Sequence, residues 1–302
     1  METHGFFKEH EGAHGKYMRH EGGRMGKGNC RQLACLPVAI LFATGHAWSL
    51  QASGTQSPPP KSSVNVSAHI PKEQLERETE LKKLMDAGQE AFHQGKYEQA
   101  ISLYQQALDF TKRLDPKEEG QILVMTTSHA LADLGNSYLG LHQYSKAKTT
   151  FASLLEFGQK NLPFDSSVAG AFEDLAVVDG AQGNWPAAED YLRRGIAYVE
   201  ECVNHFKRSD TYNPQDIVAN GDRRLEMRML TEIGNVYANQ SDFDAALSAY
   251  EQAFQIGDRF KADPESQRRV IDSAVRIAQL SRRNDQLNSW VNRSKALLAK
   301  ID

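Results

Sequence analysis

The chain has 302 residues with 35 basic and 39 acidic side chains, and its mean hydropathy is −0.56. These values are typical of a soluble globular chain and exclude a multispanning membrane protein. The net charge of −4 disfavours general nucleic-acid binding, which needs positive charge to displace phosphate counterions. Three cysteines are too few for a fold held together by disulfides.

The first 30 residues are rich in glycine and histidine and show no hydrophobic periodicity, so we expect no stable fold there. The histidines of this leader are His4, His10, His14 and His20. The segment from His10 to His14 matches the H-E-x-x-H pattern of zinc peptidases, but that chemistry needs a rigid helix. A metal-associated protein that uses the leader is therefore an alternative function, whereas a peptidase is disfavoured.

An uninterrupted apolar run follows at residues 33–43, with Lys27 and Arg31 before it and small or polar residues after it. This pattern predicts a secretory signal peptide, and a start at Met25 would give that peptide a more ordinary length. A membrane span needs about 20 apolar residues. This run of eleven apolar residues ends too early, at Thr44, for a typical span. An uncleaved anchor over residues 33–50 and an apolar patch that packs on the folded body are the alternatives to cleavage. We expect an exported protein, periplasmic or extracellular.

Composition divides the chain into three parts. Residues 1–52 form the leader with the signal peptide or anchor, residues 53–72 a Pro/Ser-rich linker, and residues 73–302 the folded body. The leader contains 6 basic and 4 acidic residues, which leaves 29 basic and 35 acidic residues in the rest. The part that folds is therefore more acidic than the whole chain, with a net charge of −6.

Helical periodicity dominates from about residue 73, and four segments share one pattern. In each, a small residue precedes an alanine by twelve positions, and an aromatic residue lies between them. The small residues are Gly88, Gly135, Ala176 and Gly234; the alanines are Ala100, Ala147, Ala188 and Ala246; the aromatic residues are Tyr97, Tyr144, Trp185 and Phe243. Small side chains let two helices approach to about 8–9 Å, so the pattern predicts repeated helical hairpins.

The pattern resembles the tetratricopeptide repeat, a helix–turn–helix unit with small residues where its helices cross. The resemblance implies an all-α, right-handed superhelical solenoid of about four to five repeats, in which stacked neighbours bury a continuous core. The predicted repeats span residues 81–117, 124–163, 168–207 and 225–262, and a degenerate capping hairpin spans residues 266–300.

The repeats are longer than the standard unit of 34 residues, because the intervals between equivalent alanines are 47, 41 and 58 residues. In this respect they resemble the long repeats of kinesin light chains and of bacterial peptide-sensing regulators. The longest interval contains Asn213-Pro214, which predicts a break between two helices.

The resemblance also implies where a partner would bind, because the first helices of such repeats line a concave face. A carboxylate precedes the small residue by two positions in every repeat, at Asp86, Asp133, Asp174 and Glu232. Side-chain amides follow the small residue at Gln89, Asn136 and Asn235, and amides can pair with both backbone groups of an extended peptide. We therefore expect an acidic, amide-lined groove for a basic or polar segment. An ordinary solvated helix face is the alternative.

One subset of the family clamps a terminal carboxylate with Lys, Arg and Asn on this face. The matching positions here are Met85, Asp133, Gly170 and Asp174. The clamp is therefore missing, and a ligand that ends in a carboxylate is disfavoured.

The sequence contains no P-loop, dinucleotide-binding glycine pattern, G-x-S-x-G elbow or CxxC pair. Cys202, the only cysteine outside the leader, is predicted to pack on an extended second helix. We therefore expect no enzyme activity, cofactor or bound metal. The predicted function is a non-catalytic scaffold or adaptor that binds a protein or peptide, and a self-associating structural repeat protein is a further alternative.

Overall fold

A computed structural model describes residues 72–117, 119–207 and 217–299. The predicted leader, its apolar run, nearly all of the linker and the Asn213-Pro214 break lie outside these residues. Within the described ranges the chain forms ten helices and no strand, which confirms the all-α prediction. None of the helices in the described part is both long and apolar enough to cross a membrane.

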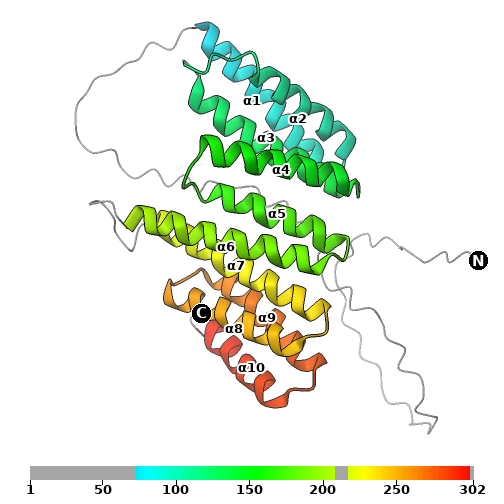
Figure 1. Ribbon diagram of the computed structural model, residues 1–302, viewed down its shortest axis with the longest axis vertical. Coiled ribbons are helices and arrows are strands. Elements are labelled where there is room, and N and C mark those ends of the chain that lie inside the picture. The colour runs from blue at the N-terminus through cyan, green and yellow to red at the C-terminus, as the bar shows by residue number, and fades with distance from the viewer. Residues whose placement is uncertain (1–71, 118, 208–216, 300–302) are drawn as a thin grey trace, which may run out of the picture. The chain divides into compact units, whose positions relative to one another are not determined.

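The helices pair into hairpins that follow one another in chain order (Figure 1). The pairs are α1 (Lys72–His93) with α2 (Tyr97–Thr111), α3 (Gly120–Gly140) with α4 (Tyr144–Asn161), α5 (Ser167–Ala181) with α6 (Trp185–Lys207), α7 (Ile217–Asn239) with α8 (Phe243–Arg259), and α9 (Pro264–Leu280) with α10 (Asn284–Leu298). Each hairpin also packs against the next one, so the helix–turn–helix solenoid is confirmed. The first helix of each hairpin begins one to nine residues ahead of the predicted start of its repeat.

The predicted aromatic residues mark the starts of the second helices. Tyr97, Tyr144, Trp185 and Phe243 are the first residues of α2, α4, α6 and α8. The alanine three residues further along each of these helices is completely buried, with 0% of its surface exposed. The spacing in the sequence therefore corresponds to one repeated helix crossing.

Three of these crossings are contacts between a glycine and an aromatic ring. Tyr104 packs on Gly88, Phe151 on Gly135 and Tyr250 on Gly234. All three rings are at most 1% exposed. A Cβ atom on any of these glycines would overlap the ring, so each crossing requires a residue without a side chain.

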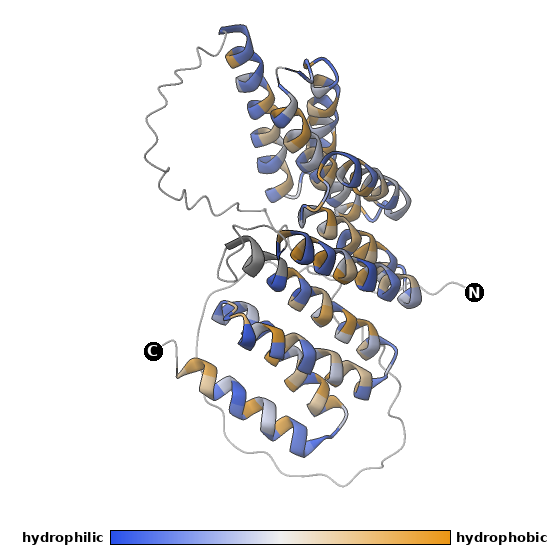
Figure 2. Cartoon of the chain, turned by 60° about the vertical axis from the view of Figure 1, so that its left-hand side comes forward, coloured by the Kyte–Doolittle hydropathy of each residue, from blue (hydrophilic) through white to orange (hydrophobic). Residues whose placement is uncertain are grey.

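The apolar faces of successive hairpins share clusters of buried side chains. One cluster joins α5, α6 and α7 through Leu192, Val199 and Met229, and another joins α7, α8 and α9 through Tyr250 and Ile271. Figure 2 shows hydrophobic residues along the sides of helices that face their neighbours. The terminal helix α10 adds Trp290 and Leu297 to the cluster that contains Tyr250 and Ile271. Cys202 is fully buried on α6.

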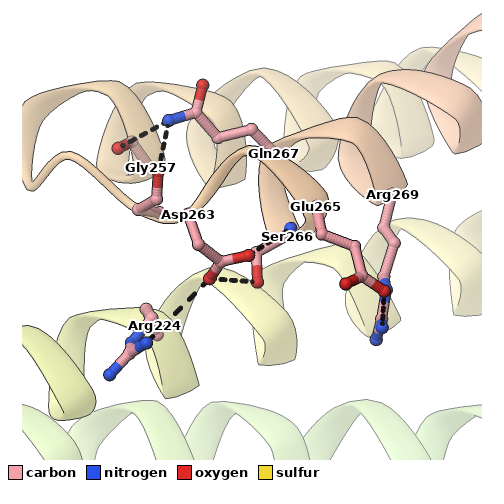
Figure 3. A network of polar contacts seen from close by, with 8 residues as sticks. Arg224, Gly257, Asp263, Glu265, Ser266, Gln267 and Arg269 are labelled. Atoms are coloured by element: carbon pink, nitrogen blue, oxygen red, sulfur yellow. Dashed lines mark hydrogen bonds and ion pairs between the residues drawn. The ribbon is translucent and has the colours of Figure 1, made fainter. Parts of the chain in front are cut away.

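Polar contacts fix the turn between α8 and α9 (Figure 3). The Asp263 side chain is the N-cap of α9, since one carboxylate oxygen accepts a hydrogen bond from the Ser266 backbone N–H at 2.9 Å and the other accepts one from the Ser266 hydroxyl at 2.8 Å. Arg224 on α7 lies 3.9 Å from the same carboxylate. The Gln267 amide donates to the carbonyl oxygens of Gly257 and Ala262. Together these contacts connect three helices at one point.

Replacing Gly135 by alanine should lower the free energy of unfolding by about 1–3 kcal/mol, because the added methyl group overlaps the buried Phe151 ring. Gly170, a second helical glycine, is the matched control, since a Cβ atom added there would have no neighbouring atom within 4 Å. Gly170→Ala should leave stability unchanged or raise it by up to about 1 kcal/mol. Urea unfolding measures both, and equal effects of the two substitutions would contradict the packing argument.

The cap at Asp263 gives a second stability prediction. Asp263→Ala removes the acceptor for the first turn of α9 and should cost about 1 kcal/mol. Asp263→Asn keeps a good cap and removes only the charge near Arg224, so its effect should be clearly smaller. Thermal unfolding followed by circular dichroism compares the two variants, and an asparagine variant as unstable as the alanine variant would show that the charge matters more than the cap.

Candidate partner-binding face

The predicted carboxylates lie on the first helices of the hairpins, where the structure separates them into two kinds. Asp133 on α3, Asp174 on α5 and Glu232 on α7 are half-buried. On α1, by contrast, Asp86 and Gln89 are exposed, and Asp86 accepts a hydrogen bond from Lys82 on its own helix at 2.6 Å. Three of the four predicted carboxylates therefore lie in a partly enclosed environment, and the α1 residues do not.

An ion pair connects α5 to α7 across this face. Arg228 donates from Nε to Oε1 of Glu173 at 2.7 Å, and its Nη2 donates to the second carboxylate oxygen of the same residue. The Glu173 side chain is 13% exposed and the Arg228 side chain is 39% exposed, so the carboxylate of this pair is largely shielded from water and the guanidinium is not. Arg228 also interacts electrostatically with Asp174 and Glu232, so one guanidinium interacts with three carboxyl groups.

Tyrosines of two second helices reach this face. The Tyr104 hydroxyl, on α2, donates a hydrogen bond to Asp133. The Tyr250 hydroxyl donates to Oδ1 of Asn235 at 2.7 Å, and the Asn235 amide donates to Glu232 at 3.1 Å. These tyrosines are the same residues that pack on Gly88 and Gly234, so the helix crossing and the polar face are connected.

The carboxyl groups have raised pKa values, chiefly because burial disfavours their charged forms. Burial and the neighbouring Glu173 raise the pKa of Asp174 to about 8, against the opposing effect of Arg228. Burial raises the pKa of Glu232 to about 7, although the hydrogen bond from Asn235 favours ionisation. Burial likewise raises the pKa of Asp133 to about 6, against the Tyr104 hydrogen bond and His93.

We call Asp133, Glu173, Asp174 and Glu232 the acidic face. Asp133 and Asp174 interact electrostatically, and Glu173 interacts with both Asp174 and Glu232, so the group extends across three hairpins. Of the described side chains, Arg228 is the cation that contacts it directly. A face with more carboxyl groups than cations, some of them held neutral by burial, can accept a further positive charge.

Sequence reasoning found three members of the acidic face and missed Glu173 and Arg228. Arg228 precedes Glu232 by four residues, so helical periodicity places both on one side of α7. The contact between Arg228 and Glu173 joins helices from different hairpins, and no spacing in the sequence reports it. Asn136 is half-buried on α3, beside Gly135. The concave groove itself remains a prediction.

The described residues contain no group of three or more His, Cys, Asp or Glu side chains that could hold a metal ion. The acidic face therefore lacks the geometry of a metal site. The histidines of the leader lie outside the described residues.

Two segments of the chain match models of the tetratricopeptide repeat, at residues 89–118 and 228–256. The first extends from α1 through α2, and the second covers the end of α7 and most of α8. These matches and the fold support a tetratricopeptide-repeat solenoid. A search of curated proteins gives no significant match.

Solved structures with the same fold include BtubC (BKLC) from P. vanneervenii, at 18% identity and a TM-score of 0.56, which covers 75% of this chain and 83% of BtubC. Aspartyl phosphate phosphatase F from Bacillus subtilis is 13% identical with a TM-score of 0.61, over 76% of this chain and 53% of that protein. The Rap conjugation gene regulator of plasmid pLS20, in complex with the Phr* peptide, is 14% identical with a TM-score of 0.53, over 80% of this chain and 60% of the regulator.

These identities are low enough that the similarity concerns the fold alone. The chain spans about half to three fifths of the length of the last two proteins, so their activities do not transfer with the fold. The name of one neighbour describes a phosphatase, and the similarity to it is a similarity of helical repeats.

The raised pKa values predict how stability depends on pH. In the unfolded chain Asp174 ionises near its ordinary pKa of 3.8, whereas the folded chain holds the proton to about pH 8. Protonated Asp174 therefore contributes fully to the free energy of unfolding below about pH 4, and this contribution is lost as the pH rises to 8. Asp174→Asn should make the fall in unfolding free energy between pH 5 and pH 8 shallower.

Urea unfolding at several pH values measures this slope. Asp86→Asn is the matched control, because the Asp86 side chain is exposed on α1 and should not change the slope. A wild-type protein whose stability rises from pH 5 to pH 8 would show that other groups dominate.

Proposed function

We propose that this chain is a non-catalytic protein-interaction scaffold that binds a basic or polar segment of a partner on the acidic face. The observation that carries the proposal is the convergence of Glu173, Asp174 and Glu232 around the guanidinium of Arg228. Asp133, on a third hairpin, interacts electrostatically with Asp174 and extends this group. A tetratricopeptide-type solenoid supports it, because stacked helices present an extended surface for a partner chain. The complex of one structural neighbour with a peptide supports the same class of ligand.

A cationic side chain would bind by completing the charge balance of this face. Its approach favours the ionised forms of Asp174 and Glu232, which burial keeps partly protonated near neutral pH. Binding should therefore release protons and should become tighter as the pH rises from 6 to 8. Asn136 lies one residue after the small residue of α3, where its amide can pair with the backbone of a bound segment. The equivalent Asn235 on α7 already bonds to Tyr250 and Glu232.

The proposal includes export. The apolar run at residues 33–43 and the cations before it support a secretory signal peptide. Amino-terminal sequencing of the protein purified from its host tests this part, and a mature chain that still begins at Met1 or Met25 would contradict cleavage.

Binding of labelled peptides tests the ligand class. The probe is an extended peptide of lysine, glutamine and serine, and its counterpart has glutamate in place of lysine. We expect the basic peptide to bind and the acidic peptide not to bind on this face. Asp133→Asn with Asp174→Asn should weaken binding by about tenfold or more, because both substitutions remove charge and keep shape. Fluorescence anisotropy at pH 6 and pH 8 gives the affinities.

The controls separate charge loss from unfolding. Asp86→Asn removes one carboxylate from exposed α1 and should leave binding unchanged. The stronger substitutions Asp133→Lys and Asp174→Lys should abolish binding, with folding checked by circular dichroism. Unchanged binding in these variants would refute the acidic face as the site, and tighter binding at pH 6 would refute the proton-release mechanism.

A further inference from the structure

A second surface lies between the second helices of two successive hairpins. A cleft of about 890 Å³ is lined by α6 on one side, α8 on the other and α7 between them. Both α6 and α7 are 23 residues long, and they belong to the repeats separated by the longest interval in the sequence. The extra turns of α6 and α7 supply residues such as Val203, Lys207 and Arg223 to the cleft, so the long interval contributes part of its lining.

The inner part of the cleft is apolar. Ile196 on α6, Leu230 on α7 and Ile256 on α8 are half-buried, and Val203, which also lines the cleft, is 2% exposed. Three partly exposed aliphatic side chains from three helices therefore border one cavity. Such a surface gains free energy when an apolar side chain of a ligand covers it.

One end of the cleft is basic and aromatic. Two arginines lie near the Phe260 ring, since the guanidinium carbons of Arg223 and Arg259 are 5.2 and 5.3 Å from its centroid. Arg223 is also paired with Glu226. Lys207 and Arg259 are exposed, and within the described residues neither forms an ion pair with a carboxylate. Among the described residues that line the cleft, Arg193, Lys207, Arg223 and Arg259 therefore outnumber the carboxylates of Glu200 and Glu226.

The cleft and the acidic face lie on opposite sides of α7. Glu226 and Leu230 border the cleft, whereas Arg228 and Glu232 belong to the acidic face or contact it. Leu230 and Glu232 are two residues apart, which is a rotation of about 200° around a helix. A ligand in the cleft would therefore leave the acidic face free.

We infer that the cleft binds an acidic segment of a partner protein that carries an aromatic or aliphatic anchor. The anchor covers Ile196, Leu230 and Ile256, and the carboxylates of the segment pair with Lys207 and Arg259. Charge complementarity selects this occupant, because the basic end favours carboxylates just as the acidic face favours cations. The inference goes beyond the proposed function, since it gives the scaffold a second site for a partner of opposite charge.

Selection from a random-peptide library on the full chain tests the inference, followed by affinity measurements with the selected peptides. We expect one class of peptides with acidic residues next to an aromatic or aliphatic residue. The double substitution Lys207→Glu and Arg259→Glu should lower the affinity for these peptides by roughly tenfold or more. Both side chains are exposed, so this variant should fold as the wild type does.

Two matched variants complete the test. Arg268→Glu makes the same kind of charge change at an exposed position of α9 outside the cleft and should leave the affinity unchanged. Asp174→Asn, on the acidic face, should also leave it unchanged. Failure to select acidic peptides, or equal loss of affinity with Arg268→Glu, would overturn the inference.

Other occupants would also overturn it. Residues 208–216, which follow α6 in the sequence and lie outside the described residues, contain Asp210 and Tyr212. If acidic peptides bind only after Asp210→Ser and Tyr212→Ser, the occupant of the cleft is this segment of the chain. If sedimentation shows a dimer that the double substitution at Lys207 and Arg259 dissociates, the occupant is a second copy of the chain.

Discussion

The contact between a small residue on one helix and a buried side chain on the next is the constraint on which the solenoid depends. Gly88, Gly135 and Gly234 each face an aromatic ring that is at most 1% exposed. Because a Cβ atom would not fit, the distance between the two helices is set by backbone against ring. Residues two places before the glycine are carried to one face of the first helix, and alanines of the second helix enter the core.

The same contact connects the core to the acidic face. The rings of Tyr104 and Tyr250 cover glycines, and their hydroxyl groups donate hydrogen bonds to Asp133 and Asn235. Phe151 occupies the equivalent place in the second hairpin and has no hydroxyl group to donate. The polar network is therefore built on the helix crossings, and carboxyl groups so close to a packed interior have raised pKa values because burial disfavours their charge.

The helix α7 is the element where the two proposed surfaces meet. Its residues alternate between the side that faces α5 and the acidic groups and the side that faces the cleft between α6 and α8. A scaffold with an acidic surface and a basic cleft on opposite sides of one helix could hold two partners without competition between them. The unequal repeat lengths therefore have a structural consequence, since the longer helices supply part of the lining of the cleft.

The sequence by itself determined the repeats, because helix crossings impose a fixed spacing of twelve residues between small residues, and it placed Tyr97, Tyr144, Trp185 and Phe243 at the starts of second helices. It also placed Asp133, Asp174 and Glu232 on equivalent positions, since helical periodicity is a local property. Only the tertiary structure decided that Asp86 stays apart, that Arg228 pairs with Glu173, and that the long helices α6 and α7 border a cleft. These features arise from contacts between helices distant in the chain, which depend on how the hairpins stack and leave no periodic trace in the sequence.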